Sequence, residues 1–197
     1  MDIDPMETLE TAKEAKQAGR LNVLVALMVA LLATFMGICK VKDDNICQAM
    51  QQAQADKIDH WGFYQARNLR EEVAKSTLVQ LRLAQVSRPV AEQEGYRQAI
   101  ASYEALAAEQ NAKKQELKKQ ADADQGTYDA LNFRDDQFDL SDALLAIAIS
   151  LLAVTALTRQ RWLFYTALVP VGFGVLMGLA GLCGWNVHPT ALVKLLS

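Results

Sequence analysis

Three long apolar segments around a charged middle region constrain the fold of this chain more than any other feature. They cover residues 21–39, 140–157 and 162–185, and they contain one carboxylate, Asp142, and no Lys or Arg. A helix needs about 20 residues to cross a hydrocarbon core about 30 Å thick. We therefore expect an all-α membrane protein with three transmembrane helices, and the lipid bilayer as its first partner.

The region between the first two apolar segments, residues 40–139, is rich in charged residues and good helix formers. From Asn45 to Gln85 it has no Pro and a single Gly, so we expect the first membrane helix to continue outward. Pro89 predicts a break, because a proline disfavours helix at the residue before it. A second helix is expected from Pro89 to Asp124, with Gly126 near its end as a C-terminal cap. Together these features predict a long extramembrane antiparallel helical hairpin between the first and second membrane helices.

The second half of this region carries apolar residues at three- and four-residue spacing, as on one face of a coiled coil. Gln110 and Lys114 interrupt this stripe. Its members are Tyr96, Ile100, Tyr103, Ala107, Leu117, Ala121, Tyr128 and Leu131. We expect this face to pack in a coiled-coil-like hairpin, with Tyr96, Ile100 and Tyr103 as candidate interaction residues.

Charge and motif content argue against several functions. Acidic residues slightly outnumber basic ones in the middle region, so we expect no nucleic acid partner. The sequence contains no phosphate-binding glycine loop, nucleophile elbow or His-centred triad, so we do not expect an enzyme. His60 and His188 lack a cysteine or carboxylate array at ligand spacing, and we therefore expect no metal site and no cofactor.

Basic residues near the segment ends predict the orientation, because Lys and Arg resist translocation. Lys13, Lys16 and Arg20 precede the first apolar segment, and Arg159 and Arg161 lie in the short connection 158–161. We expect both groups on the cytoplasmic side of the membrane, and the hairpin on the opposite, outer side. Two lysines just after the first segment oppose this orientation, but two aspartates that follow them partly offset their charge. The first segment is longer than a usual signal-peptide core, so we interpret it as an uncleaved signal anchor.

This interpretation divides the chain into seven parts. They are a cytoplasmic N-terminal segment (1–20), a membrane helix (21–39), the hairpin (40–139), a second membrane helix (140–157), a cytoplasmic turn (158–161), a third membrane helix (162–185) and a C-terminal tail (186–197).

The densest aromatic cluster lies in the first half of the expected hairpin. At helical spacing Trp61 and Tyr64 share one face, so they can attach this helix to its hairpin partner or to a neighbouring subunit. Gly62 would let a second backbone approach closely. The same surface has polar groups on Gln65 and Arg67 and is also a candidate ligand site. The candidate interaction residues here are Trp61, Phe63, Tyr64, Gln65 and Arg67.

The residues around this cluster, Asp59, Trp61 and the run Tyr64-Gln65-Ala66-Arg67, form a short pattern that follows an N-terminal membrane helix. This pattern resembles that of the bacterial membrane family catalogued as domain of unknown function 4337. The C-terminal half is also similar to that family, in residues 138–143, 157–159 and Trp162. The resemblance implies a bacterial membrane protein and supplies no activity.

Small residues recur at interface spacing in two of the apolar segments. Small side chains let helix backbones approach closely in lipid, and so support a tight bundle within the chain or a homo-oligomer. The candidate packing residues are Ala26, Ala30 and Gly37 in the first segment, and Gly174, Gly178 and Gly181 in the third.

Asp142 lies at the membrane end of the second apolar segment and has two interpretations. We expect a first-turn acid at a helix start, with Ser141 or Asp139 as the cap, because the helix N-terminus favours negative charge. The alternative is an ion or proton site, since ionisable groups inside membrane spans are costly and often functional.

Two function classes follow from these features. The first is a structural or interaction protein that self-associates, or docks on a larger membrane complex, through its hairpin and its small-residue membrane faces. The second is an oligomeric channel or transporter component. We favour the first, because the three spans carry one marginal ionisable residue and no visible inverted repeat.

Overall fold

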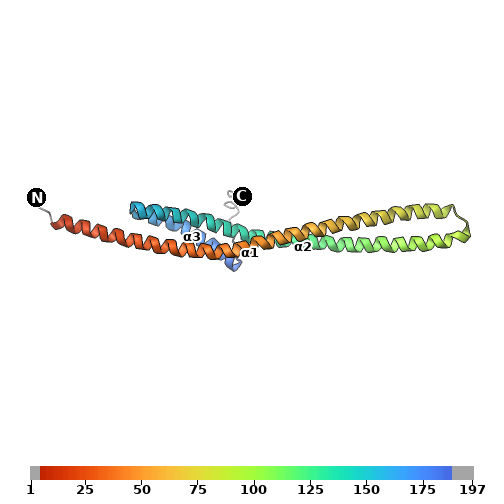
Figure 1. Cartoon of the computed structure of the whole chain (residues 1–197), viewed down its shortest axis with the longest axis horizontal. Helices are drawn as coiled ribbons and strands as arrows, with labels where there is room; N and C mark the ends of the chain where they lie inside the picture. The colour runs from red at the N-terminus through yellow and green to blue at the C-terminus, as the bar shows by residue number, and fades with distance from the viewer. Residues whose placement is uncertain (1–4, 188–197) are drawn as a thin grey trace. The chain divides into compact units, whose positions relative to one another are not determined.

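The computed structural model describes the backbone of residues 5–187 and the side chains of residues 19–187, and every regular element in this part is helical. In chain order these are α1 (Pro5–Val86), the short 3₁₀ helix η1 (Val90–Glu92), α2 (Gln93–Thr158) and α3 (Arg161–Cys183) (Figure 1). The expected all-helical fold is confirmed. Lys13, Lys16, His188 and the tail beyond residue 187 lie outside the described side chains.

Three helical stretches in the described residues are long and apolar enough to cross a membrane. They lie within Gly19–Val86, Val90–Thr158 and Arg161–Cys183. This result agrees with the predicted number of helices that could cross a membrane.

The first break in the helical chain falls where Pro89 predicts it. Ser87 and Arg88 close the end of α1 by donating their backbone N–H groups to Ala84 and Gln85, at 3.3 and 3.2 Å. Pro89 then adopts an extended backbone, with ψ at 153°, and caps η1. The chain thus leaves one helix and enters the next within a few residues.

Helix α2 corrects two expectations. It runs from Gln93 to Thr158 without interruption, so it does not end near Gly126 and has no N-terminus at Asp142. An isolated Gly inside a helix costs only about 1 kcal/mol relative to Ala, which is too little to end a helix that packs along its length. Asp142 is therefore not a helix-start acid.

The connection from α2 to α3 and the end of α3 both use left-handed backbone. Arg159 has φ 56° and donates its backbone N–H to Thr155 at 2.8 Å. Gly184 has φ 69° at the end of α3, and the N–H of Trp185 reaches back to the Ala180 carbonyl at 2.9 Å. The second arrangement is the usual glycine-based helix ending, because glycine has no Cβ to clash at positive φ.

The chain divides into two compact units. One consists of Met1–Gln48 and Leu131–Ser197, which we call the three-helix unit, and the other is Ala49–Ala130, which we call the two-helix unit. Helices α1 and α2 each contribute to both units, whereas α3 belongs to the three-helix unit alone.

The core of the three-helix unit draws on all three helices. It consists of Val25 and Leu32 from α1, Leu145, Ala148 and Leu152 from α2, and Ala167 from α3. The buried α1 positions 25, 32, 39 and 46 repeat every seven residues, as do the α2 positions 145 and 152. A seven-residue period is the signature of coiled-coil packing.

The two-helix unit is held by paired contacts between α1 and α2 (Figure 1). Its core consists of Ala74, Leu78 and Ala107, with Ile100 and Tyr103 packed against it. Polar pairs join Lys57 with Gln125, Asn68 with Lys114, and Arg82 with Glu104. Residue numbers rise on α1 as they fall on α2, so the two segments of this unit are antiparallel.

Candidate functional site

A polar layer interrupts the apolar contact between α1 and α2 in the two-helix unit. Glu71 is buried, with 5% of its side chain exposed, and forms an ion pair with Lys114 at 2.6 Å. Lys114 also donates to Asn68 at 3.1 Å, and Arg67 donates to Gln110 at 3.0 Å. Gln110 and Lys114, the two residues that interrupt the predicted stripe, thus both have polar partners on α1.

Lysine partners set the charge state of Glu71. Hydrogen bonds from Lys114 and then from Lys75 lower the pKa of its carboxyl group, although burial opposes this. Lys75 is exposed and contacts Glu71 at 2.7 Å. The layer is therefore an ionised, paired cluster, and a buried carboxylate without these lysines would be costly.

The predicted aromatic cluster on α1 is divided between two faces. Trp61 and Tyr64 stack with ring centroids 4.9 Å apart, and Tyr64 and Arg67 are half-buried toward α2. Phe63 and Gln65 are exposed. No atom of the described residues lies within 4 Å of a Cβ built on Gly62, so no second backbone from the described part of the chain approaches it.

The predicted stripe on α2 faces α1. Tyr96, Ile100 and Tyr103 are half-buried, and Ala107 is buried in the core of the two-helix unit. Leu117, Ala121, Tyr128 and Leu131 are also buried or half-buried.

The sequence pattern did not reveal a second apolar stripe on α1. The residues of this stripe are exposed. Their spacing places them on one side of α1, opposite the side on which Ala74 and Leu78 are buried. Leu69 and Leu83 are its most central large residues, at 65% and 69% exposure. The apolar members of the stripe are Ile58, Leu69, Val79, Leu83 and Val86, with Trp61 beside them, and the exposed polar residues Gln65, Glu72 and Ser76 lie on the same side. We call it the outer stripe.

Three glycines of α3 lie where other helices pass closely. A Cβ on Gly174 would lie 2.8 Å from Leu145, one on Gly178 would lie 2.7 Å from the Phe35 ring, and one on Gly181 would lie 2.8 Å from Phe138. Ser141 also donates its hydroxyl to the Gly174 carbonyl at 2.8 Å.

The candidate packing residues of the first apolar segment are placed differently. Ala26, Ala30 and Gly37 are exposed, and nothing lies within 4 Å of a Cβ built on Gly37. Helix α1 instead buries Val25, Leu32 and other residues of the seven-residue series. These three small residues are therefore not buried within the described chain, and only the homo-oligomer alternative still involves them.

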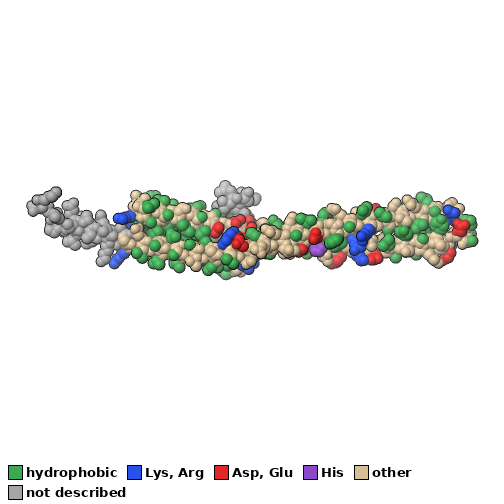
Figure 2. All heavy atoms as spheres, in the orientation of Figure 1, with side chains coloured by type: hydrophobic (Ala, Val, Ile, Leu, Met, Phe, Trp, Pro, Cys, Tyr) green, Lys and Arg blue, Asp and Glu red, His purple; other side chains and the backbone are tan. Residues whose placement is uncertain are grey.

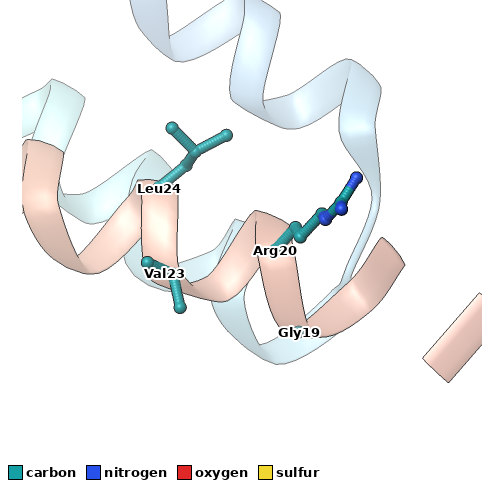
Figure 3. A pocket seen from close by; sticks show the side chains of 4 residues that line it. All are labelled: Gly19, Arg20, Val23 and Leu24. Carbon is teal, nitrogen blue, oxygen red and sulfur yellow. The ribbon is translucent and has the colours of Figure 1, made fainter. Parts of the chain in front are cut away.

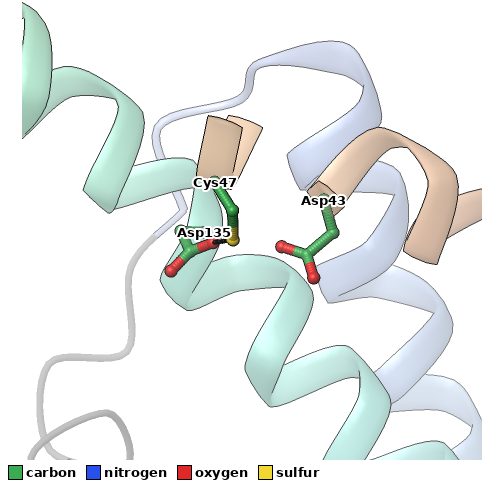
Figure 4. Close-up of side chains that lie close together, drawn as sticks. All are labelled: Asp43, Cys47 and Asp135. Atoms are coloured by element: carbon green, nitrogen blue, oxygen red, sulfur yellow. Dashed lines mark hydrogen bonds between the residues drawn. The ribbon is translucent and has the colours of Figure 1, made fainter. Parts of the chain in front are cut away.

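A cluster of two carboxylates and a thiol lies in the three-helix unit, between α1 and α2 (Figure 4). The ligand atoms of Asp43, Cys47 and Asp135 all lie within 4.8 Å of one another. The Cys47 thiol donates to Asp135 Oδ1 at 3.1 Å. Asp43 is buried, at 5% exposure; its Oδ2 accepts from Lys40 at 2.8 Å, whereas its Oδ1 has no hydrogen-bond partner.

The surroundings of this cluster favour its protonated forms. Burial, followed by the charge of Asp43, raises the pKa of Asp139, and burial also raises the pKa of Asp135, to which Asp43 adds. The bond to Asp135 and burial raise the pKa of the Cys47 thiol to about 11. The cluster thus concentrates acidic groups, with Lys40 as the positive charge paired with Asp43.

Two of the three residues of this cluster lie close together in the sequence. Asp43 and Cys47 lie four residues apart, which places them on one face of a helix. Asp135 is 88 residues beyond Cys47, and only the packing of α2 on α1 brings it there. The expectation of no metal site was based on the two histidines and did not consider these three residues.

Asp142 is half-buried in the middle of α2, one turn beyond the buried Phe138. Nearby, Arg134 donates to the Gly181 carbonyl at 2.8 Å and Gln137 donates to the carbonyls of Trp185 and Val187. These bonds fix the end of α3 against α2.

Two depressions lie near the start of the described side chains. One is lined by Gly19, Arg20, Val23 and Leu24 (Figure 3). The other, of about 320 Å³, is lined by apolar side chains together with Arg20 and Arg161. Both are open to the surface, and neither encloses a small molecule.

The comparisons with known proteins gave one match. The family model described as Domain of unknown function (DUF4337) matches residues 21–184, which is most of the chain. No curated protein and no solved structure matches it.

Proposed function

We propose that this chain, which belongs to the DUF4337 family, is a membrane-anchored structural protein that self-associates through an extramembrane helical hairpin. The observation that carries the proposal is the outer stripe of α1, an apolar face that no part of the described chain covers. A membrane location, a hairpin outside the bilayer and a partner for this stripe are the three parts of the proposal.

The surface of the three-helix unit supports a membrane location. Figure 2 shows hydrophobic side chains over its visible face, and many large ones are exposed. Leu31 is 68% exposed on α1, and Val169 and Phe173 are exposed on α3. Soluble proteins seldom expose apolar patches this extensive, whereas a bilayer would cover them. The bacterial inner membrane is the membrane that we propose.

Residues 40–139 then lie outside the bilayer as the antiparallel hairpin. Its polar layer and its many surface ion pairs require water or protein partners, because charged groups at the bilayer centre are costly. The arginines of the α2–α3 connection support a cytoplasmic position for that connection and for the N-terminus.

The orientation is tested with impermeant thiol reagents on intact cells or sealed vesicles. In a chain whose three cysteines are replaced by serine, Ser87→Cys should react from the periplasmic side, and Gln160→Cys only after lysis. Reaction of both variants from the same side would contradict the three-span topology.

We propose a second copy of the chain as the occupant of the outer stripe. The outer face of α2, opposite its contact with α1, carries the exposed small residues Ala101, Ala105, Ala108 and Ala112 at three- and four-residue spacing. Large side chains such as Leu69 and Leu83 can pack on such a face, because alanine lets helix backbones approach. One chain thus offers both halves of a repeated contact, and such a contact closes into rings or extends into arrays.

Native mass measurement of the gently solubilised full chain tests this proposal. We expect the wild-type chain to form oligomers and the double variant Leu69→Lys with Leu83→Lys to shift to smaller species. Phe63→Lys is the matched control, because Phe63 is equally exposed, at 61%, but lies away from the outer stripe. An unchanged copy number in the double variant would contradict the proposal.

The same preparation separates this role from the alternative of a channel or transporter component. Protein reconstituted into liposomes should not move ions. Conductance that is lost on Asp142→Asn would favour the alternative. A companion subunit in the native mass spectrum would instead favour docking on a larger complex.

A further inference from the structure

The geometry points to a zinc site in the three-helix unit, in which Asp43, Cys47 and Asp135 supply one carboxylate oxygen, one thiolate sulfur and one carboxylate oxygen. The ion would lie between α1 and α2, outside residues 21–39 and 140–157. This site is separate from the outer stripe and does not depend on self-association.

The ligand atoms already lie close to the arrangement that zinc needs. All three lie within 4.8 Å of one another, and the Cys47 sulfur is 3.1 Å from Asp135 Oδ1. Zinc binds sulfur at about 2.3 Å and carboxylate oxygen at about 2.0–2.2 Å, in tetrahedral geometry. Small side-chain rotations would therefore bring the three atoms onto one ion.

An unpartnered oxygen marks the centre of the cluster. Asp43 is more than nine-tenths buried, and its Oδ1 accepts no hydrogen bond, while its Oδ2 is bonded by Lys40. Figure 4 shows the Asp43 carboxylate facing Cys47 and Asp135. A buried carboxylate oxygen without a donor is costly, and a cation would remove that cost.

The ligand types select the metal. A thiolate favours zinc and other borderline or soft ions over Mg²⁺ and Ca²⁺, which prefer oxygen ligands. Binding deprotonates the thiol, and the proton leaves to solvent. Three protein ligands leave a fourth position open for water or another small ligand, as in zinc sites that are not purely structural.

Titration with Co²⁺, a spectroscopic substitute for zinc, tests the site in the tag-free, chelator-stripped full chain. We expect one equivalent per chain, with a sulfur-to-cobalt charge-transfer absorption that added Zn²⁺ abolishes and excess Mg²⁺ does not. Cys47→Ser should abolish this absorption. Asp43→Asn and Asp135→Asn should weaken binding by at least about 100-fold, since loss of even an outer-shell partner costs about 10–100-fold.

Matched controls separate the site from general effects of charge or thiol content. Asp44→Asn changes the exposed neighbour of Asp43, and Cys183→Ser removes an exposed thiol; both should bind cobalt as the wild type does. Circular dichroism checks that each variant remains helical. In the wild-type chain, saturating Zn²⁺ should also slow alkylation of Cys47 and leave that of Cys183 unchanged.

Three results would overturn the inference. These are no cobalt binding by the folded wild-type chain, a charge-transfer band that survives Cys47→Ser, and equal effects of the Asp43 and Asp44 substitutions. A cluster that holds a shared proton in place of a metal would give the first of these results.

Discussion

At the scale of single residues, Glu71 and Lys114 form a charged pair within a contact that is otherwise apolar. Replacing such a pair with apolar residues is often neutral or stabilising, whereas removing one partner is destabilising. A polar pair at one level of two packed helices can also define their register, because any shift would separate the charges. We therefore expect this pair to contribute more to the register in which α1 and α2 align than to the stability of their packing.

The first prediction concerns the response of Glu71 to acid. Its pKa in the folded chain lies below the value of about 4.3 in an unfolded chain. Its contribution to stability is therefore fully present above about pH 4.3, and it is lost as the pH falls through the lower, folded pKa. Glu71→Gln should cost about 1.5–3 kcal/mol at neutral pH, the range for a hydrogen bond to a charged group. The difference between the variant and the wild type should shrink below pH 4.

Unfolding measured by hydrogen exchange in the two-helix unit checks this prediction. Glu72→Gln is the control, because Glu72 is 60% exposed and also contacts Lys75. A surface pair of this kind contributes about 0–1 kcal/mol. Equal effects of the two substitutions at neutral pH would show that burial of Glu71 has no energetic consequence.

The second prediction concerns the close contact at Gly178 of α3. A Cβ there would lie 2.7 Å from carbon atoms of Phe35 and 2.8 Å from Ser141 Oγ, so Gly178→Ala forces α1, α2 or α3 to move. We expect a loss of about 1–3 kcal/mol, typical of overpacking. Gly172→Ala, in the same helix with nothing within 4 Å, should be neutral or stabilising. Thermal unfolding in one detergent compares the two, and similar melting temperatures would contradict the packing of α3.

At the scale of elements, α2 crosses two positions at which the sequence suggests a helix boundary. Gly126 has helical backbone within α2, whereas Gly184 has φ 69° at the end of α3. The two glycines should therefore respond oppositely to the same change.

The third prediction is that Gly126→Ala stabilises the chain and Gly184→Ala destabilises it, each by about 1 kcal/mol. Alanine is the better helix former at position 126, where a Cβ meets nothing within 4 Å. At position 184 a Cβ clashes with the backbone at positive φ. Thermal unfolding and helicity by circular dichroism measure both effects. Loss of stability in Gly126→Ala would mean that α2 ends there after all.

Local sequence signals were sufficient for the elements that depend on local chemistry. The break at Pro89, the apolar segments and the three- and four-residue stripe on α2 follow from backbone restriction and periodicity. The predictions of a helix end near Gly126 and a helix start at Asp142 were wrong, because a helix ends where its packing ends. Both positions belong to a helix with partners along its length. A glycine or an acid at such a position has a small local cost, which tertiary contacts outweigh.

The candidate sites depend on contacts between distant residues, and sequence reasoning found only parts of them. It identified Gln110 and Lys114 as interruptions but could not supply Glu71 as the partner of Lys114. It did not identify Asp43 and Cys47, which lie one helical turn apart, and Asp135 joins them only through the register of α1 and α2. The outer stripe includes polar positions such as Gln65 that weaken its periodic signal.

At the scale of the whole molecule, exposed apolar side chains occur in both units, and we assign them to different partners. In the three-helix unit they occur on all three helices, as expected for contact with lipid. In the two-helix unit most of those on α1 belong to the outer stripe, as expected for contact with another helix, whereas Phe63, Val73 and Leu106 lie outside it. The exposed fraction of a side chain does not tell whether lipid or another helix covers it. The free-energy cost of placing a charge at that position does distinguish the two.

The fourth prediction uses this difference in cost. Leu31→Arg should reduce membrane insertion, because arginine near the centre of a spanning helix costs about 2.5–3.5 kcal/mol on insertion scales. Phe63→Arg should insert as the wild type does, since residue 63 lies in the part that we place in water. Leu31 and Phe63 have similar exposure, at 68% and 61%, so loss of packing within the chain does not separate them. Resistance to alkaline extraction from membranes measures insertion. Equal retention of the two variants would mean that α1 does not cross the bilayer at Leu31, and the apolar surface of the three-helix unit would then require a protein partner.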